Sequence, residues 1–231
     1  MNLLFIHGAG GTKSKWRAMK DFYGPSQYRM VDLPGHGENQ FDRATSIQEY
    51  ADHLKDTIQE DTIVVGHSMG GLIALELAER SEKVKGIVLA ASCYETPVHS
   101  KILDRLKNGE FPESLFYASY GKETSEQLLQ EEKREISWVS TEISYIDFHA
   151  CDQYQDGKEK LSSLSIPVCA ILGEKDRLLP EGAADLLKRV NPSIKVTEIK
   201  GAGHFIMLEK PNEFSQSLNA FVDEVEAKYN Y

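Results

Sequence analysis

The segment of residues 66–70 carries the pattern G-x-S-x-G, with Ser68 at its centre. It follows the apolar run of residues 62–65 and precedes a stretch with helical spacing at residues 72–78. So tight a turn between a strand and a helix needs glycine on either side, and it holds the serine hydroxyl clear of the backbone. The first N–H groups of the helix also favour a developing negative charge. The pattern predicts Ser68 as a nucleophile and the Met69 N–H as a donor to an oxyanion.

A serine hydroxyl is a poor nucleophile near neutral pH unless a neutral imidazole lies within reach and a carboxylate orients that imidazole. His204 is the best candidate base, because it lies in a glycine-rich loop directly after the run of residues 196–199. Loops at the carboxyl ends of parallel strands are where open sheets hold their ligands. We expect structural or solvent-exposed positions for the other histidines: His7, His36, His53, His67, His99 and His149.

Two carboxylates compete for the role of the acid that orients His204. Asp176 and Glu174 both follow the apolar run of residues 168–172. We favour Asp176 and keep Glu174 as the alternative. The resulting chain order of serine, then aspartate, then histidine differs from the orders found in the two unrelated serine protease types.

A second glycine-rich loop, residues 7–11, follows the first apolar run of the chain. It has neither the spacing of a phosphate-binding loop nor that of a dinucleotide-binding loop. Its backbone N–H groups can instead supply the second donor of an oxyanion hole, and we expect Ala9 to provide it, with Gly10 as the alternative. For His7 we expect a hydrogen bond that holds the loop rather than a part in the chemistry.

Short apolar runs alternate with segments of helical spacing along most of the chain. The runs read as strands buried on both faces: residues 3–6, 28–31, 63–65, 84–90, 166–172 and 194–199. Helical spacing occurs at residues 16–22, 47–58, 72–78, 183–190 and 214–225. This alternation predicts an α/β fold, with a mostly parallel sheet of about six strands flanked by helices.

The alternation breaks at residues 93–164, where helix-like patterns and aromatic residues predominate. We expect a helical insertion there, with residues 1–92 and 165–231 forming the core. The charge run Glu131–Glu135 predicts a solvent-exposed helix face. Eight side chains of the insertion favour a mostly apolar pocket, although some of them can serve as the insertion's own core: Phe111, Leu115, Phe116, Tyr117, Tyr120, Trp138, Tyr145 and Phe148.

The composition argues against several classes of partner. The chain has 231 residues and a formal net charge of −10, which opposes contact with nucleic acid or an anionic membrane. No run is long enough to span a membrane and the first residues lack a basic leader, so we expect a cytoplasmic protein. The three cysteines, Cys93, Cys151 and Cys169, lie far apart without C-x-x-C spacing, so we expect structural thiols, with neither a disulfide framework nor a zinc site.

Together these motifs resemble the α/β-hydrolase family over nearly the whole chain, through His7-Gly8, residues 32–37, residues 66–70, Asp176 and Gly203-His204. Within the family the chain looks like the compact bacterial carboxylesterases and related C–C hydrolases, which implies a helical cap at residues 93–164. The resemblance also makes residues 32–37 a structural turn beside the pocket. Family members usually carry a strand hairpin before the His-Gly motif that is missing here, which leaves a sheet edge in need of cover. A monomer, or a homodimer formed through that edge, is expected.

The resemblance implies a serine hydrolase that cleaves a small, mainly apolar carboxylic ester through an acyl-enzyme, without metal or cofactor. Ser68 argues against the dehalogenase and epoxide-hydrolase branches, which carry an aspartate at that position. Three alternatives stay open: a C–C bond hydrolase, a lyase like the menaquinone-pathway member of the family, and a non-catalytic receptor for a small molecule. The first two use the same triad, so the sequence does not separate them from an esterase.

Overall fold

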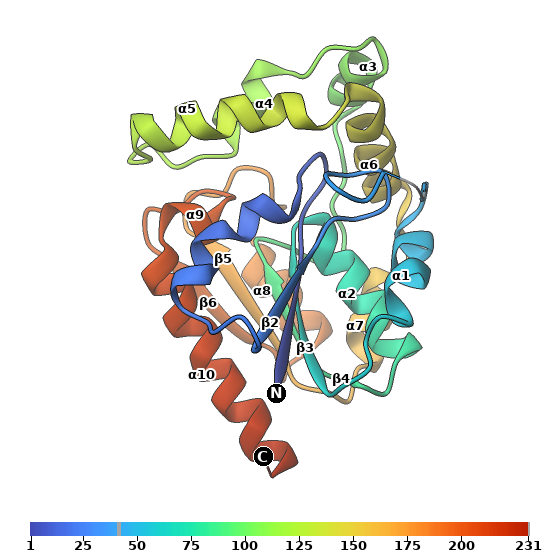
Figure 1. Cartoon of the computed structure of the whole chain (residues 1–231), viewed down its shortest axis with the longest axis vertical. Coiled ribbons are helices and arrows are strands. Elements are labelled where there is room, and N and C mark those ends of the chain that lie inside the picture. Colours follow the sequence, from blue (N-terminus) through green and yellow to red (C-terminus); the bar gives the residue numbers. More distant parts are fainter. Residues whose placement is uncertain (41–42, 231) are drawn as a thin grey trace.

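The computed structural model describes residues 1–40 and 43–230, and its centre is a six-stranded parallel sheet flanked by helices (Figure 1). In the strand order β2-β1-β3-β4-β5-β6, β2 lies on one side of β1 and forms an edge, and β3 to β6 follow in turn on the other side. This confirms the predicted α/β fold and its six strands. The strands are β1 (Asn2–Ile6), β2 (Tyr28–Val31), β3 (Thr62–His67), β4 (Val84–Ala90), β5 (Val168–Gly173) and β6 (Lys195–Ile199).

Alternate side chains of the central strands enter two hydrophobic layers, one on each face of the sheet. In β1, Leu4 and Ile6 belong to the first layer, whereas Leu3 and Phe5 belong to the second. Strands β3 and β5 are buried throughout, whereas the edge strands β2 and β6 are partly exposed. Burial on both faces explains why the central strands are apolar at nearly every position.

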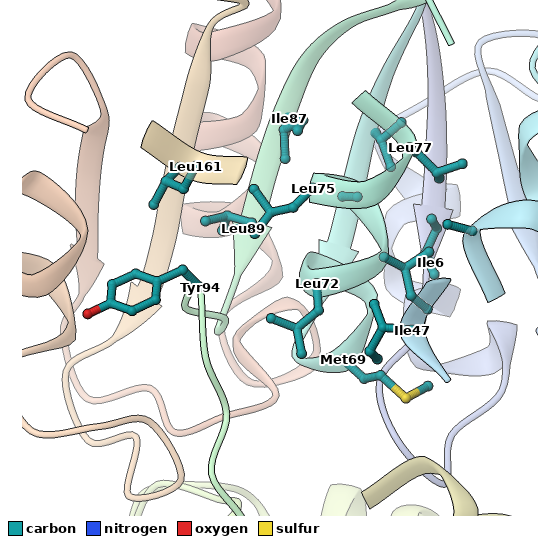
Figure 2. Packing of buried hydrophobic residues seen from close by; sticks show 14 of the residues in the cluster. Ile6, Ile47, Met69, Leu72, Leu75, Leu77, Ile87, Leu89, Tyr94 and Leu161 are labelled. Carbon is teal, nitrogen blue, oxygen red and sulfur yellow. The ribbon is translucent and has the colours of Figure 1, made fainter. Parts of the chain in front are cut away.

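Helices supply the other half of each layer. The first layer holds α1 (Ile47–Lys55), α2 (Met69–Arg80), α7 (Gly157–Ser163) and α8 (Ala183–Val190). In Figure 2, Leu75 of α2 lies with Leu89 of β4 in this layer. The second layer holds the 3-10 helix η1 (Lys13–Asp21) with α9 (Ile206–Glu209) and α10 (Pro211–Tyr229). The predicted helices are all present, although the helix expected at residues 16–22 is the 3-10 helix η1, which ends at Asp21, and α1 ends three residues before the expected Ile58.

Between β4 and β5 lies the helical insertion, a name used here for residues 93–164. Its helices are α3 (Ser100–Lys107), α4 (Glu113–Ala118), α5 (Glu126–Glu135), the 3-10 helix η2 (Ile136–Trp138), α6 (Thr141–Gln153) and α7. Figure 1 shows α3 to α6 above the carboxyl ends of the strands, whereas α7 packs beside α2. The insertion therefore stands over the edge of the sheet where the candidate catalytic residues were expected.

The prediction of a solvent-exposed face for the charge run Glu131–Glu135 was wrong for two of its members. Glu132 is fully buried and Glu135 is only 9% exposed. The reason is that α5 lies against η1, which presents Lys15 and Arg17 to these carboxylates. A buried charge needs an opposite charge and hydrogen bonds, and both come from a segment more than a hundred residues earlier in the chain.

The structure also shows where the three cysteines lie and how apolar the helices are. Cys93, Cys151 and Cys169 are all buried and free, as the sequence predicted. Within residues 1–40 and 43–230, no helix combines the length and the apolar character that crossing a membrane demands.

Candidate active site

Ser68 occupies the turn between β3 and α2 with a φ of 52°, a left-handed conformation that residues other than glycine rarely adopt. A Cβ atom at Gly66 would overlap the carbonyl group of Gly70, and one at Gly70 would lie 2.5 Å from the carbonyl oxygen of Ile6. Both positions therefore require glycine. The Ser68 N–H donates to the carbonyl of Ala90 in β4 at 3.0 Å, which fixes the turn against the neighbouring strand.

The turn places Ser68 at the amino-terminal end of α2, with Met69 as the first residue of the helix. The first N–H groups of a helix have no acceptor within the helix, and they carry the positive end of its dipole. Negative charge that develops beside Ser68 therefore meets N–H donors that are already oriented. Met69 begins α2 directly after Ser68, and its role as an oxyanion donor stays a prediction.

His204 and Asp176 form a hydrogen-bonded pair at the carboxyl ends of the last two strands. His204 Nδ1 donates to Asp176 Oδ2 at 2.8 Å, and the other carboxylate oxygen accepts the N–H of Leu178 at 2.8 Å. A carboxylate acceptor places the imidazole proton on Nδ1 and leaves Nε2 free to act as a base. Ser68 and His204 line the same cavity. No hydrogen bond joins these two described side chains, and such contacts are commonly loose without substrate.

Glu174, the alternative acid, lies away from His204. Its carboxylate accepts the N–H of Gly201 at 2.9 Å and contacts Lys175 at 3.1 Å on the protein surface. The Gly201 hydrogen bond and the Lys175 charge lower the pKa of Glu174. Of the two candidates, only Asp176 touches the imidazole.

The loop that carries His204 is held by the helical insertion and by α9. The His204 N–H donates to the Ser119 carbonyl at 2.7 Å. One carboxylate oxygen of Glu209 accepts the N–H groups of Gly203 at 3.1 Å and Gly121 at 2.8 Å. A side chain at Gly203 would collide with the backbone of the segment 119–121. The glycine before His204 is therefore needed for this close packing.

The glycine-rich loop of residues 7–11 is held from two sides. His7 Nδ1 donates to the Gly8 carbonyl at 2.9 Å, and His7 Nε2 accepts the N–H of Leu33 at 3.1 Å, so His7 holds the loop as predicted. Burial lowers the pKa of His7 to about 4, which keeps the ring neutral and able to accept this bond. The Gly10 N–H is occupied by Asp147 at 2.7 Å. The N–H of Gly10, the alternative oxyanion donor, is therefore engaged elsewhere, whereas Ala9, the expected donor, lines the cavity.

The cavity beside Ser68 has a volume of about 270 Å³ and is roofed by the helical insertion. Five of the eight predicted side chains line it: Phe111, Leu115, Phe116, Tyr120 and Phe148. The other three do not, because Tyr117 and Trp138 are 50% and 58% exposed and the Tyr145 ring stacks on His149. The wall is mainly apolar, in agreement with the sequence.

One side of the cavity carries charges that sequence analysis missed. Lys15 and Glu132 both line it, and the Lys15 ammonium contacts Glu132 at 2.5 Å. Burial alone raises the pKa of Glu132, but the charges of Lys15 and Arg17 lower it below its usual value. The Tyr120 hydroxyl donates to the same carboxylate at 2.9 Å. The sequence does carry a signal, because residues 13–17 are basic and residues 131–135 include three glutamates. Pattern analysis of each segment alone does not reveal that the two segments meet.

The remaining histidines hold structural or exposed positions. His67 Nε2 donates to the His204 carbonyl at 3.0 Å, and burial lowers the pKa of His67 well below its usual range. His53 and His99 are exposed, and His99 begins helix α3 as its cap. His36 makes a buried contact with Asp147. In the described part of the chain, no cluster of three or more histidine, cysteine, aspartate or glutamate side chains has an arrangement suited to a metal ion.

Comparison with known proteins agrees with this geometry. The model of the alpha/beta hydrolase family matches residues 3–216. The chain is 25% identical to pimeloyl-[acyl-carrier protein] methyl ester esterase of Yersinia pseudotuberculosis, over 96% of this chain and 93% of that protein. The structure of a thermophilic esterase superimposes with a TM-score of 0.81 at 26% identity, over 97% of this chain and 90% of the other. MenH from S. aureus shares the fold, with a TM-score of 0.78 at 18% identity over 98% and 94% of the two chains. The chain therefore belongs to the alpha/beta hydrolase family.

Proposed function

We propose that the protein hydrolyses small, mainly apolar carboxylic esters through an acyl-enzyme. The observation that carries this proposal is the His204–Asp176 hydrogen bond at the wall of the cavity where Ser68 stands on its strained turn. A neutral imidazole held in this tautomer is the base that a serine nucleophile requires. The esterases among the relatives support the same reaction class.

In the proposed reaction His204 Nε2 takes the proton of the Ser68 hydroxyl as Oγ attacks the ester carbonyl carbon. The tetrahedral intermediate collapses to an acyl-enzyme, and His204 returns the proton to the departing alcohol. Water then attacks the acyl group with His204 again as base, which releases the acid and restores Ser68. The N–H groups of Ala9 and Met69 stabilise the oxyanion of each tetrahedral intermediate.

The cavity supports a small substrate. Its volume of about 270 Å³ lies just below the usual range for ligand sites, which begins at about 300 Å³. Its apolar side, formed by residues such as Phe111 and Phe148, suits a short or medium acyl chain. We further propose that residues 93–164 act as a cap over this cavity and that residues 1–92 and 165–231 form the catalytic core. A cytoplasmic location and a monomeric or homodimeric state stay predictions from the sequence.

The test compares hydrolysis of p-nitrophenyl acetate, butyrate and octanoate by the wild type and three variants. Ser68→Ala and Asp176→Asn are expected to lower kcat by about 10⁴-fold, as the loss of triad members does elsewhere. Glu174→Gln is the matched control, because Glu174 lies near Asp176 in sequence but contacts Gly201 and Lys175 rather than His204. Glutamine keeps an oxygen acceptor for the Gly201 N–H, so the rate is expected to stay close to that of the wild type.

Equal rates for wild type and Ser68→Ala would overturn the proposed nucleophile. A folded wild type that turned over none of the three esters would instead favour a C–C bond hydrolase or a lyase with the same triad. Binding of small molecules without any turnover would favour a receptor.

A further inference from the structure

Asp147 of α6 has no part in the triad, yet its carboxylate contacts three segments of the chain that lie outside the helical insertion. It is fully buried. Its Oδ2 accepts the N–H of Gly10 at 2.7 Å and Nε2 of His36 at 2.8 Å, and its Oδ1 accepts the Tyr50 hydroxyl at 2.6 Å. A buried carboxylate with three donors is satisfied in its hydrogen bonds and fixed in its direction.

The charge of Asp147 is balanced by His36. His36 Nδ1 faces the Pro34 carbonyl at 3.0 Å, and its Nε2 faces Asp147 at 2.8 Å. Both partners are acceptors, so both ring nitrogens donate and the ring is an imidazolium. Burial alone lowers the pKa of His36, but the hydrogen bond and the charge of Asp147 raise it above its usual value. The neighbouring ring of His7, with centroids 4.9 Å apart, stays neutral, in part because of the His36 charge.

Gly10 is the residue of the loop of residues 7–11 that Asp147 contacts. It has a φ of +64°, and a Cβ atom there would lie 2.9 Å from the Ser144 hydroxyl, so α6 packs directly on its backbone. The hydrogen bond to Asp147 sets the direction of the peptide between Ala9 and Gly10. The Gly8 carbonyl is held on the other side by His7. The Ala9 N–H belongs to the same peptide as the Gly8 carbonyl, and the next peptide carries the Gly10 N–H, so His7 holds it from one side and Asp147 from the other.

We propose that Asp147 is a positioning residue for the oxyanion hole, which it orients from the helical insertion by holding the Gly10 peptide. It acts through Ala9 and does not touch the substrate. This inference rests on the proposed function, since it assigns Ala9 as an oxyanion donor. It also gives the helical insertion a part in the chemical step, beyond roofing the cavity.

The test measures two quantities in wild type, Asp147→Ala and Tyr50→Phe: kcat and KM for p-nitrophenyl butyrate, and the Kd of phenylboronic acid by calorimetry. A boronate bound to Ser68 is tetrahedral and anionic, so its affinity reports on the oxyanion hole without turnover. For Asp147→Ala we expect kcat to fall by between about 10- and about 100-fold with KM nearly unchanged, approaching the loss of one whole donor. The Kd for the boronate should rise by a similar factor.

Tyr50→Phe is the matched control. It removes one hydrogen bond from the same carboxylate but leaves both contacts of Oδ2, so kcat and boronate affinity are expected to stay within about threefold of wild type. If Asp147→Ala does not fold, the double variant His36→Leu with Asp147→Leu takes its place, because replacing both members of a buried pair by apolar residues is far better tolerated than removing one. The same losses are expected from it.

Unchanged kcat and boronate affinity in a folded variant that lacks Asp147 would overturn the inference. So would a rise in KM alone, or equal losses in Tyr50→Phe, since these indicate a general packing role. A wild type that hydrolyses no ester contradicts the proposed function instead, and boronate binding still decides the role of Asp147.

Discussion

Replacing Glu132 by Gln is expected to destabilise the protein strongly, because it removes the fully buried counter-charge of the buried Lys15 and the half-buried Arg17. The Glu132 carboxylate contacts Lys15 at 2.5 Å and Arg17 at 2.8 Å and accepts the Tyr120 hydroxyl at 2.9 Å. Glu135, at 3.0 Å from Lys15, and Glu131, at 3.3 Å from Arg17, complete a cluster of two positive and three negative charges. The substitution is isosteric, so it removes charge while disturbing packing little.

The expected magnitude follows from these distances. Two unit charges 2.8 Å apart attract by about 6 kcal/mol at an effective dielectric constant near 20, before desolvation is subtracted. Breaking one buried pair typically costs about 3–5 kcal/mol net. Because Lys15 keeps Glu135 and Arg17 keeps Glu131 and Glu135 as partners, we expect the lower end, about 3 kcal/mol, for Glu132→Gln. For a chain of this size that corresponds to a fall in Tm of roughly 6–12 °C.

Urea unfolding followed by circular dichroism measures this change as a shift in midpoint at constant slope. Glu131→Gln is the control, because Glu131 precedes Glu132 in α5 and pairs with Arg17 at 3.3 Å, but lies on the exposed side. Little change is expected there. A Glu132→Gln protein that unfolds at the wild-type midpoint would refute the idea that this cluster fastens α5 to the core. Equal effects of the two substitutions would refute it as well.

Three further outcomes are expected. Because the pKa of His7 is lowered to about 4, folded His7 binds fewer protons than unfolded His7 below pH 6.5. His7 alone should therefore contribute a fall in the unfolding free energy of about 1.4 kcal/mol per pH unit between pH 6.5 and 4, and His7→Gln should lose that contribution. A Cβ atom at Gly66 would overlap the Gly70 carbonyl, so Gly66→Ala should prevent folding. Gly109 has open space around it, so Gly109→Ala should lower the unfolding free energy, measured by thermal unfolding, by only about 1–2 kcal/mol. Burial raises the pKa of Cys151 to about 12, so a thiol reagent at pH 8 should label it only after unfolding.

Features encoded by local patterns were predictable from the sequence. The sheet was predicted because strands buried on both faces are apolar at nearly every position, as in β3 and β5. The turn at Ser68 was predictable because its two glycines have steric causes within a few residues. The boundaries of α1 and the 3-10 character of η1 were not, since a helical period does not reveal where a helix ends or how tightly it is wound.

Features that depend on distant residues were predicted less well. Asp176 and Glu174 follow the same strand, so the sequence kept Glu174 as the alternative acid, and the structure separates them by contact, with Asp176 at His204 and Glu174 at the surface. Glu132 was misjudged because its partners lie more than a hundred residues earlier. Asp147 gave no signal at all, since its partners are 97, 111 and 137 residues away. A single buried carboxylate in a helix has no periodic pattern to reveal it.

The contacts of the helical insertion with both loops of the site have a consequence for protein engineering. Exchanging such an insertion between relatives is an obvious route to a new substrate range. Here the exchange would remove the Ser119 carbonyl, which accepts the His204 N–H, and the Asp147 carboxylate, which accepts the Gly10 N–H. A working chimera would have to transfer these residues together with His36, or supply equivalents. In this chain, the insertion that covers the cavity also holds the two loops beside it, so the insertion cannot be exchanged without disturbing those loops.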